Sequence, residues 1–342
     1  MTSLEFTQQL LKQVVPKMAY SEVNNHQKWQ EEAYDKLEQL LGLPLPECED
    51  CFEVVEDVQE QDYRCITFQF QSELGYYQKC TMLVPSEIDQ PVPGVICMQG
   101  HSSGAHISIG KEKFEGDAKT ISGGRDFALQ AVKLGYCAIS VEQRYMGENG
   151  QVETGDPACI KKNAALPSIL IGRTAIGERV WDIHRLIDII ENHLTEFIDA
   201  TRIICMGNSG GGTTTFYAAC YDRRIYMAIP SCAVCTYDDS IGAMFHCSCN
   251  YVPNIRTYFN MGDLGCLIAP RPIFVVSGER DPIFPLEGAK ASVKVMMKAY
   301  EKLDAKDNCY HIIGDGGHQF FPEDVWPMVK KYIEEKGMKD EI

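Results

Sequence analysis

The residues best suited to chemistry surround a serine that lies between glycines. Gly207-Asn208-Ser209-Gly210-Gly211 follows the apolar run 202–206 and precedes residues 212–220, a pattern typical of a strand that turns sharply into a helix. Such a turn strains the serine backbone, lifts Oγ above the sheet and leaves the Gly210 N–H at a helix N-terminus, where it can face a developing oxyanion. Ser209 is therefore the candidate nucleophile. Glycines also occur in ordinary strand-to-helix turns, so the pentapeptide alone is a weak signal.

An acid and a histidine each follow a later strand of the expected sheet. Asp281 comes just after the expected strand 272–277, and His318 lies in a glycine-rich loop after the expected strand 310–313. A serine hydroxyl is too weakly acidic to attack an ester unaided, so a histidine must take its proton and a carboxylate must hold the imidazole. Three residues of suitable type, each after a strand, predict a catalytic triad of Ser209, Asp281 and His318.

Two other carboxylates compete with Asp281 for the acid role. Glu279 lies inside the turn that follows the same strand, and Asp315 is too near His318 in the sequence for the usual placement on separate strands. We therefore expect Asp281 to be the residue that holds His318.

A second glycine-containing loop follows the apolar run 92–98 and begins Gln99-Gly100-His101. Loops at the carboxyl end of a central strand are where α/β sheets bind ligands. We expect the N–H of His101 to join that of Gly210 in an oxyanion hole, with Gly100 allowing a close approach of the backbone. The alternative is that Gly100 and His101 serve turn geometry alone.

Two long segments without clear periodicity interrupt the regular elements. Residues 142–172 include a polar loop, through Asp156 and Pro157, that is too long for a simple connection, and residues 231–270 have the composition expected of a cap over a binding site. The candidate substrate-binding residues are Gly100, Arg173, His246, Asn250 and Tyr251.

The remaining pattern alternates apolar strands with amphipathic helices. Residues 1–50 are expected to form a helical extension, with a helix near 29–41 that ends at Gly42, and residues 51–84 two or three antiparallel edge strands. From residue 92 onward, short buried strands alternate with helices. This pattern predicts an α/β domain over residues 51–342, with a mostly parallel central sheet and helices on both faces.

Two of the expected helices have defined limits or faces. One should run from Gly123 to Leu134. A longer one should begin at Gly172-Arg173-Thr174, with an apolar stripe that packs on the sheet. Its charged residues are expected to form a solvated face with i,i+3 and i,i+4 pairs; they are Glu178, Arg179, Asp182 and Arg185.

The overall charge disfavours several classes of partner. The 342 residues carry 32 Lys and Arg against 48 Asp and Glu, a formal net charge of −16, which repels nucleic acids and anionic membrane surfaces. The chain starts without a basic segment followed by an apolar core, and no apolar run is long enough to span a bilayer. We therefore expect a cytoplasmic protein without nucleic-acid or membrane partners. The oligomeric state stays open.

The 15 cysteines are an odd number, and many lie in expected strands, which favours small buried side chains in a reducing compartment over a disulfide framework. Three clusters have the composition of metal or redox sites: Cys48 with Cys51, Cys232 with Cys235, and His246-Cys247-Ser248-Cys249. None has the paired spacing of a compact zinc module or a thioredoxin-like context, so no metal is expected. A redox or metal role for the first two pairs stays open.

Together these motifs resemble the bacterial α/β-hydrolases grouped with acetyl xylan esterases and dienelactone hydrolases. The matching segments cover most of the chain: Trp29 with Leu40-Leu41-Gly42, Gly172-Arg173-Thr174, Arg179-Val180-Trp181-Asp182, residues 207–212, Cys249-Asn250-Tyr251-Val252-Pro253, Ala269-Pro270-Arg271-Pro272 and residues 277–285. The resemblance implies the α/β-hydrolase fold and ester hydrolysis without a metal or an organic cofactor. In the related sugar deacetylases a His-Gly-aromatic loop supplies an oxyanion donor, where this chain has Gln99-Gly100-His101.

The function expected on these grounds is that of a serine esterase. It would hydrolyse a carboxylic ester through an acyl-enzyme, with a short acyl group such as acetyl on a carbohydrate, and its substrate would be a small molecule or an oligosaccharide ester. The alternatives are a dienelactone-type hydrolase or a peptidase with the same triad, and a non-catalytic hydrolase fold that binds a ligand or partner.

Overall fold

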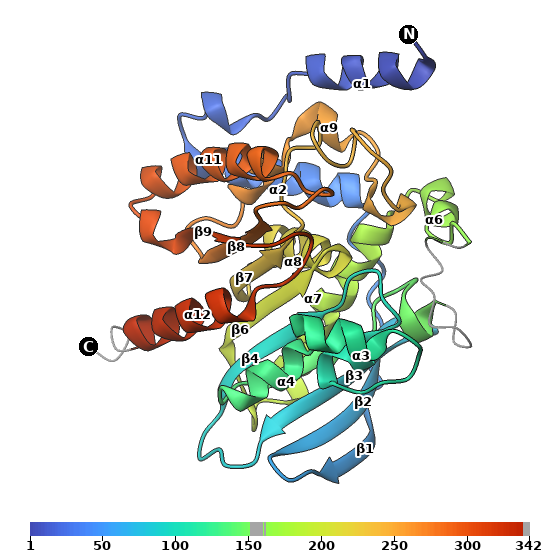
Figure 1. Ribbon diagram of the computed structural model, residues 1–342, viewed down its shortest axis with the longest axis vertical. Coiled ribbons are helices and arrows are strands. Elements are labelled where there is room, and N and C mark those ends of the chain that lie inside the picture. The colour runs from blue at the N-terminus through green and yellow to red at the C-terminus, as the bar shows by residue number, and fades with distance from the viewer. Residues whose placement is uncertain (151–159, 161, 338–342) are drawn as a thin grey trace.

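The computed structural model describes residues 1–150, 160 and 162–337. One mixed β-sheet forms the centre of this part of the chain (Figure 1). Within the described residues nine strands hydrogen-bond in the order β1-β2-β3-β5-β4-β6-β7-β8-β9. The strands are β1 (Glu53–Gln59), β2 (Tyr63–Glu73), β3 (Tyr76–Pro85), β4 (Val92–Met98), β5 (Cys137–Val141), β6 (Ile198–Asn208), β7 (Ile225–Ser231), β8 (Ile273–Gly278) and β9 (Cys309–Gly314). Strands β1, β2 and β3 are antiparallel to their neighbours, and β4 to β9 are mutually parallel. The predicted α/β fold with a mostly parallel sheet is confirmed.

Helices cover both faces of this sheet. Consecutive residues of β6 belong to different core clusters: Cys205 belongs to the cluster that contains buried residues of α2, α7, α8 and α11, and Met206 to the cluster that contains those of α4 and α12. The helices of the described residues are α1 (Ser3–Gln13), α2 (His26–Leu41), α3 (Asp117–Thr120), α4 (Phe127–Lys133), α6 (Leu166–Leu170), α7 (Ala175–His193), α8 (Gly210–Tyr221), α9 (Ile255–Tyr258), α10 (Met261–Gly265), α11 (Leu286–Lys302) and α12 (Pro322–Gly337). The predicted two-layer covering is therefore present.

The N-terminal residues form two helices of different character. Helix α2 ends at Gly42, whose φ of 74° places it in the left-handed region, and it buries Trp29 and Leu37 in the main core, as the periodicity predicted. Helix α1 has no buried residues and lies apart from the sheet at the N-terminal end of Figure 1. Its Gln8 side chain donates to the backbone of Gly242 and Ala243 in the segment 231–270.

The central strands end level with one another. In the parallel ladders, Met98 of β4 pairs with Gly207 of β6, Asn208 pairs with Ser231 of β7, and Gly278 of β8 pairs with Gly314 of β9. The chain order also changes direction at β4, which lies between β5 and β6. Such a switch point opens a crevice at the carboxyl ends of the strands. The loops after β4, β6, β8 and β9 therefore leave the same edge of the sheet.

The charged residues of α7 are mostly buried, so the prediction of a solvated face was wrong. Glu178, Arg179 and Asp182 are only 2 to 4% exposed. The reason is that the loop after β5 and the end of β2 cover this side of the helix: Arg144 donates two hydrogen bonds of 2.8 Å to the Asp182 carboxylate, and Ser72 donates a third of 2.6 Å. Periodicity finds the apolar stripe of a helix but not a buried ion pair beside it.

The other expected elements need smaller corrections. The helix expected from Gly123 begins at Phe127, because a π-helical turn at residues 121–125 precedes it. The segment 142–172 contains α6, while its residues 151–159 and 161, including Asp156 and Pro157, lie outside the described residues. The segment 231–270 contains α9, α10 and a short 3-10 helix, Ser248–Asn250. Within the described part of the chain, no helix has both the length and the apolar character needed to cross a bilayer.

Candidate active site

Ser209 occupies a strained turn between β6 and α8. Its backbone has φ 57° and ψ −124°, a conformation that non-glycine residues rarely adopt and that costs about 1–3 kcal/mol. The flanking glycines are required sterically: a Cβ atom on Gly207 would lie 2.5 Å from the backbone carbon of Gly211, and one on Gly211 would lie 2.1 Å from the backbone oxygen of Met98. The turn predicted around Ser209 is present, with the N-terminus of α8 directly behind the serine.

His318 and Asp281, after β9 and β8, form a pair in which the carboxylate is buried and the imidazole is partly exposed. Nδ1 of His318 lies 2.8 Å from Oδ2 of Asp281, and Oδ1 of Asp281 accepts hydrogen bonds from the N–H groups of Ile283 and Phe284 at 2.8 and 3.1 Å. Burial raises the pKa of Asp281, but the hydrogen bond and charge of His318 and the two backbone N–H groups lower it further, so its pKa falls below the ordinary value. The carboxylate therefore stays ionised and holds Nδ1 of the ring in its protonated form.

The rival acids lie elsewhere. Glu279 and Asp315 are exposed, and both pair with Arg280, at 3.1 and 2.7 Å. In the part of the chain that the structure describes, the carboxylate hydrogen-bonded to His318 is that of Asp281.

Strand β7 connects the serine to the histidine–carboxylate pair. The N–H of Ser209 donates to the backbone oxygen of Ser231 at 2.9 Å, and the next residue, Cys232, has its sulfur within 4.8 Å of ligand atoms of both Asp281 and His318. Burial and the nearby Asp281 charge raise the pKa of the Cys232 thiol to about 12, so it remains a neutral packing group. Nε2 of His318 is buried and has no hydrogen-bond partner among the described residues. The structure thus brings the three predicted residues to the same edge of the sheet.

The loop after β4 lies directly on this turn. A Cβ atom on Gly100 would lie 2.9 Å from Cβ of Ser209 and 3.3 Å from the backbone nitrogen of Gly210. The ring of His101 lies against Gly210, since a Cβ there would be 3.1 Å from Nδ1 of His101. The predicted neighbours of the serine on this side, Gly100, His101 and Gly210, are therefore in place.

A glutamine that the sequence analysis missed supports this loop. The side-chain amide of Gln143, at the end of β5, donates to the backbone oxygen of Gln99, and its own oxygen accepts a 2.7 Å hydrogen bond from Oγ1 of Thr214 in α8. Gln143 is 4% exposed. A polar residue directly after a buried strand is the only signal of this role in the sequence, and it does not name the partner.

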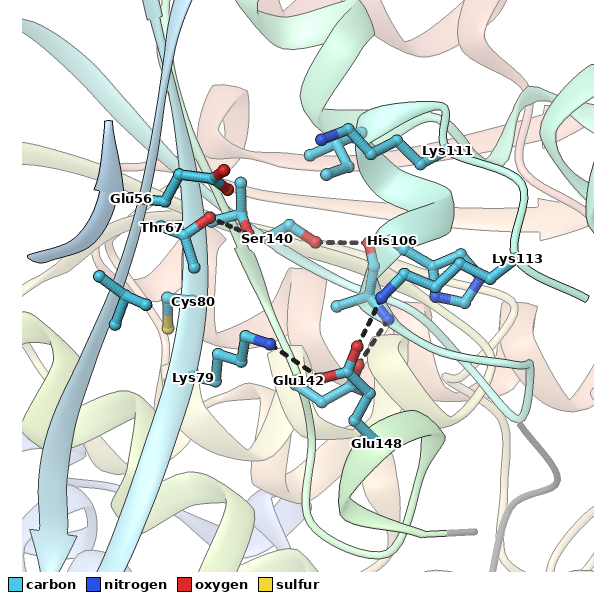
Figure 2. Close-up of a pocket in the computed structure, with 14 residues that line it drawn as sticks. Glu56, Thr67, Lys79, Cys80, His106, Lys111, Lys113, Ser140, Glu142 and Glu148 are labelled. Carbon is cyan, nitrogen blue, oxygen red and sulfur yellow. Dashed lines mark hydrogen bonds and ion pairs between the residues drawn. The ribbon is translucent and has the colours of Figure 1, made fainter. Parts of the chain in front are cut away.

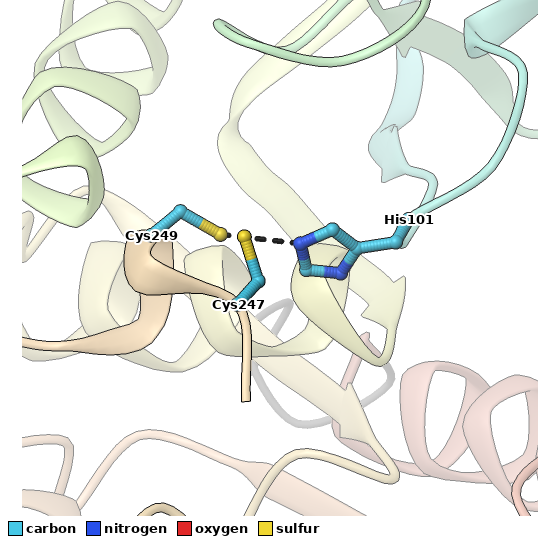
Figure 3. A group of neighbouring side chains, drawn as sticks. All are labelled: His101, Cys247 and Cys249. Atoms are coloured by element: carbon cyan, nitrogen blue, oxygen red, sulfur yellow. Dashed lines mark hydrogen bonds between the residues drawn. The ribbon is translucent and has the colours of Figure 1, made fainter. Parts of the chain in front are cut away.

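The imidazole of His101 points from the loop into the segment 231–270. Its Nε2 lies 3.2 Å from the sulfur of Cys249, and Cys247 lies beside both (Figure 3). Burial lowers the pKa of His101, but the hydrogen bonds and charges of Cys247 and Cys249 outweigh it and raise the pKa to about 9. The ring therefore joins the loop after β4 to the segment 231–270.

His246 is a neutral, packed histidine close to the other two rings. Burial and the charges of His101 and His318 lower its pKa to about 4. The Ser240 hydroxyl gives its only proton to the backbone oxygen of Ile283 at 2.7 Å, so at 3.1 Å it must accept one from Nε2 of His246. The His246 ring also packs edge-on against Phe284, which in turn stacks on His318. His246 thus lies one ring away from the triad histidine.

A groove of about 300 Å³ opens beside this site. Residues of both long segments line it: Ile160, Asn163, Leu166, Ile169, Phe245, His246, Cys247, Ser248 and Tyr251. The Tyr251 hydroxyl donates to the backbone oxygen of Ile241 at 3.1 Å, and Asn250 is buried in the short 3-10 helix beside it. Both long segments therefore contribute to the rim of the site.

Arg173 does not line this groove. Its guanidinium donates to both carboxylate oxygens of Glu73 and lies 3.7 Å from Glu178. It borders a separate hollow of about 560 Å³, together with residues such as Lys36 and Tyr258. Its predicted substrate contact therefore has no support in this arrangement, because its charge is already neutralised.

Another hollow, of about 460 Å³, lies between β3, β5 and the loop that contains His106. Figure 2 shows Lys79 and Lys113 reaching the same carboxylate, Glu148, at 3.0 and 2.5 Å. The two lysines hold the pKa of Glu148 down to about 2. None of the residues predicted for the site lines this hollow.

The sequence matches the model of the family described as "Abhydrolase family" over residues 1–311. It is also 26% identical over 243 residues to YtaP of Bacillus subtilis (strain 168), which is named as a candidate hydrolase, and the match covers 69% of this chain and 76% of YtaP.

Solved structures share the fold at low sequence identity. A protein of Bacteroides fragilis NCTC 9343, described as a candidate acetyl xylan esterase, superposes with a TM-score of 0.80 at 19% identity over 97% of this chain and 95% of its own. A glucuronoyl esterase from Solibacter usitatus superposes with a TM-score of 0.69 at 16% identity over 94% of each chain.

Proposed function

Because the chain belongs to the Abhydrolase family and is a hydrolase with the α/β-hydrolase fold, we propose that it is a serine esterase that works through an acyl-enzyme. The observation that carries this proposal is the placement of Ser209. It lies in a strained turn at the sheet edge from which the hydrogen-bonded pair His318–Asp281 also emerges. A buried carboxylate–imidazole pair beside a strained serine is the arrangement that activates a hydroxyl for attack.

The proposed reaction begins with attack of Ser209 Oγ on the ester carbonyl. Nε2 of His318 takes the hydroxyl proton, and Asp281 stabilises the imidazolium across the 2.8 Å hydrogen bond to Nδ1. The carbonyl π electrons move to the oxygen, and on collapse of the tetrahedral intermediate the alcohol leaves with the proton from His318. A water molecule then gives a proton to His318 and attacks the acyl carbon, and on collapse of the second tetrahedral intermediate His318 returns that proton to Ser209 Oγ as the acid leaves.

The developing negative charge needs donors that are already in position. We propose the N–H of Gly210, at the start of α8, and the N–H of His101, whose loop lies against the serine turn. One such donor contributes about 3–4 kcal/mol to transition-state stabilisation. Gln143 would act as a positioning residue, because it holds the backbone oxygen of Gln99.

The substrate proposed is a small ester, with a short acyl group such as acetyl on a sugar or an oligosaccharide. The groove of about 300 Å³ beside His246 and Tyr251 is at the small end of the range for ligand sites, which suits one or two sugar units. Tyr251 and Phe245 are 41 and 87% exposed there and offer aromatic surfaces to an alcohol group of the substrate. The names of the two structural neighbours, both esterases of carbohydrates, agree with this choice.

The test is turnover of an aryl acetate by the wild type and by Ser209→Ala. Loss of the attacking hydroxyl should lower kcat by at least about 10³-fold while the fold is retained, because alanine keeps the same backbone conformation. Ser122→Ala is the matched control, since this exposed serine donates to the nearby Lys119 backbone oxygen and lies outside the proposed site. Acetylated sugars, short aryl esters and peptide amides are assayed together to define the class of substrate.

A fluorophosphonate probe gives an independent readout. It should label the wild type at Ser209 and leave Ser209→Ala unlabelled. Unchanged turnover in Ser209→Ala would contradict the proposal, whereas a wild type that neither reacts with the probe nor hydrolyses any of these substrates would favour a non-catalytic binding protein.

A further inference from the structure

Three side chains with metal-binding atoms converge where the loop after β4 meets the segment 231–270. His101, Cys247 and Cys249 have Nε2, Sγ and Sγ all within 4.8 Å of one another, and Nε2 lies 3.2 Å from the sulfur of Cys249. Figure 3 shows the two sulfur atoms side by side in front of the imidazole. The sequence joins the two cysteines but gives no sign of the histidine, which comes from a distant loop.

These distances are close to those of a tetrahedral zinc site. With Zn–S of about 2.3 Å and Zn–N of about 2.0–2.1 Å, the donor atoms of such a site lie roughly 3.5–3.8 Å apart. The His101–Cys249 distance is already shorter than this, so only small side-chain adjustments are needed. Two thiolates and one neutral imidazole are also the soft donor set that zinc prefers over magnesium or calcium.

The surroundings suit a site that is enclosed but accessible. Cys249 is 1% and Cys247 7% exposed, and both pack with Met146, Ala165 and Ala175. Cys247 also lines the groove of about 300 Å³, which gives an entry path for an ion. Three protein ligands leave one position of a tetrahedral zinc ion for a water molecule, and Cys247 places the groove next to that ion.

We propose that His101, Cys247 and Cys249 bind one thiophilic divalent cation, and that this cation is Zn²⁺. Binding releases to solvent the protons held by the two cysteine sulfurs and by Nε2 of His101, and three bonds from these atoms to the metal take their place. The ion links the loop that carries His101 to the segment 231–270 at a single point. This inference does not depend on the esterase activity.

The site is tested with Co²⁺ as a spectroscopic probe. The full-length protein is reduced with a phosphine, freed of metal with a chelator and titrated without oxygen. The thiolate-to-cobalt absorption in the near ultraviolet should rise and saturate at one equivalent, and Zn²⁺ should abolish it by displacement. Cys249→Ser and His101→Gln should each weaken binding by at least about 100-fold, since even the loss of a supporting residue costs 10–100-fold.

The matched control is the double variant Cys48→Ser and Cys51→Ser. It removes two thiols from another cysteine pair, where Cys48 contacts the backbone oxygen of Gln71, and should bind Co²⁺ like the wild type. The midpoint of thermal unfolding gives a second readout: Zn²⁺ should raise it for the wild type and the control but not for Cys249→Ser.

Alkylation of the wild type keeps the proposal testable even if a variant does not fold. Bound Zn²⁺ should protect Cys247 and Cys249 from iodoacetamide, as read by peptide mapping. The proposal fails if Co²⁺ gives no thiolate absorption, if Cys249→Ser binds as tightly as the wild type, or if both cysteines are alkylated equally with and without Zn²⁺.

Discussion

Nδ1 of His318 lies 2.8 Å from Oδ2 of Asp281, in a pair whose carboxylate side chain is completely buried. The other carboxylate oxygen is fixed by the N–H groups of Ile283 and Phe284. Both oxygens are thus occupied, so the carboxylate has one orientation and the ring has one tautomer. This relationship explains why Asp281, and not the exposed Glu279 or Asp315, is suited to support a histidine base.

Asp281→Asn should therefore abolish most of the activity without unfolding the protein. An amide can offer its NH₂ group to Nδ1 and so favours the wrong tautomer of His318, which leaves no acceptor for the serine proton. We expect kcat for an aryl acetate to fall by about 10⁴-fold with little change in KM. Asp315→Asn, at an exposed position on the loop that carries His318, should retain wild-type kinetics, and an equal loss in both variants would contradict this role of Asp281.

Gly100→Ala should also impair catalysis, because the loop would be pushed away from the serine turn. The new Cβ would lie 2.8 Å from the backbone oxygen of Asn208 and 2.9 Å from Cβ of Ser209, so the backbone must shift. A misplacement of about 1 Å costs on the order of 10²-fold in rate. Steady-state kinetics on an aryl acetate measure this loss. Gly123→Ala is the control, since nothing lies within 4 Å of its Cβ, and comparable kinetics in the two variants would refute the steric argument.

Arg144→Met should destabilise the whole fold. Arg144 is 6% exposed, donates two hydrogen bonds to Asp182 and lies over the Tyr76 ring at 4.0 Å, so its removal leaves the Asp182 charge buried without its partner. We expect a loss of about 3–5 kcal/mol in the free energy of unfolding, measured by urea denaturation. Arg64→Met breaks an exposed pair with Asp57 and should cost at most about 1 kcal/mol. Equal losses would show that burial of the pair is unimportant.

Glu142→Gln should stabilise the protein much more at pH 8 than at pH 5. Burial, aided by the charge of Glu148, raises the folded-state pKa of Glu142 from 4.5 to about 7, although the Ala105 N–H bond opposes this. The folded state then holds a proton that the unfolded state releases, so stability falls as the pH rises from about 4.5 to about 7. The loss amounts to about 3 kcal/mol above pH 7, and glutamine avoids it. Urea unfolding at both pH values measures the difference, and the same gain at pH 5 would exclude this cause.

The central sheet and the serine turn could be predicted from the sequence because both depend on local patterns. Apolar runs such as 92–98 mark strands that are buried on both faces, and the glycines at positions 207 and 211 are demanded by contacts with the adjacent backbone. Ser209, Asp281 and His318 each follow a strand of a parallel sheet. Because such strands end at one edge, the sequence predicts that the three residues lie at that edge. These features need no knowledge of long-range side-chain packing.

The polar contacts between distant segments could not be predicted in this way. Such contacts join Gln143 to Gln99, His101 to Cys249 and Arg144 to Asp182. In each pair the two residues belong to different segments of the chain, and hydrophobic periodicity carries no information about which segments meet. For the same reason the sequence does not reveal that Glu73 binds the guanidinium of Arg173, which borders a different hollow. A single sequence shows which residues carry polar or reactive groups, but not which of these groups are already paired with another side chain in the folded protein.

The level ends of β4, β6, β7, β8 and β9 have a consequence for changing this molecule. Each residue along a strand advances the chain by about 3.3 Å, and successive side chains lie on opposite faces of the sheet. An insertion in a single central strand would therefore move one residue of the site out of position relative to the others. The lengths of the segments 142–172 and 231–270 are not constrained in this way. An engineer who wants a different ester accepted under the proposed function should vary groove-lining positions of those segments, such as Phe245 and Tyr251, and leave every strand at its present length.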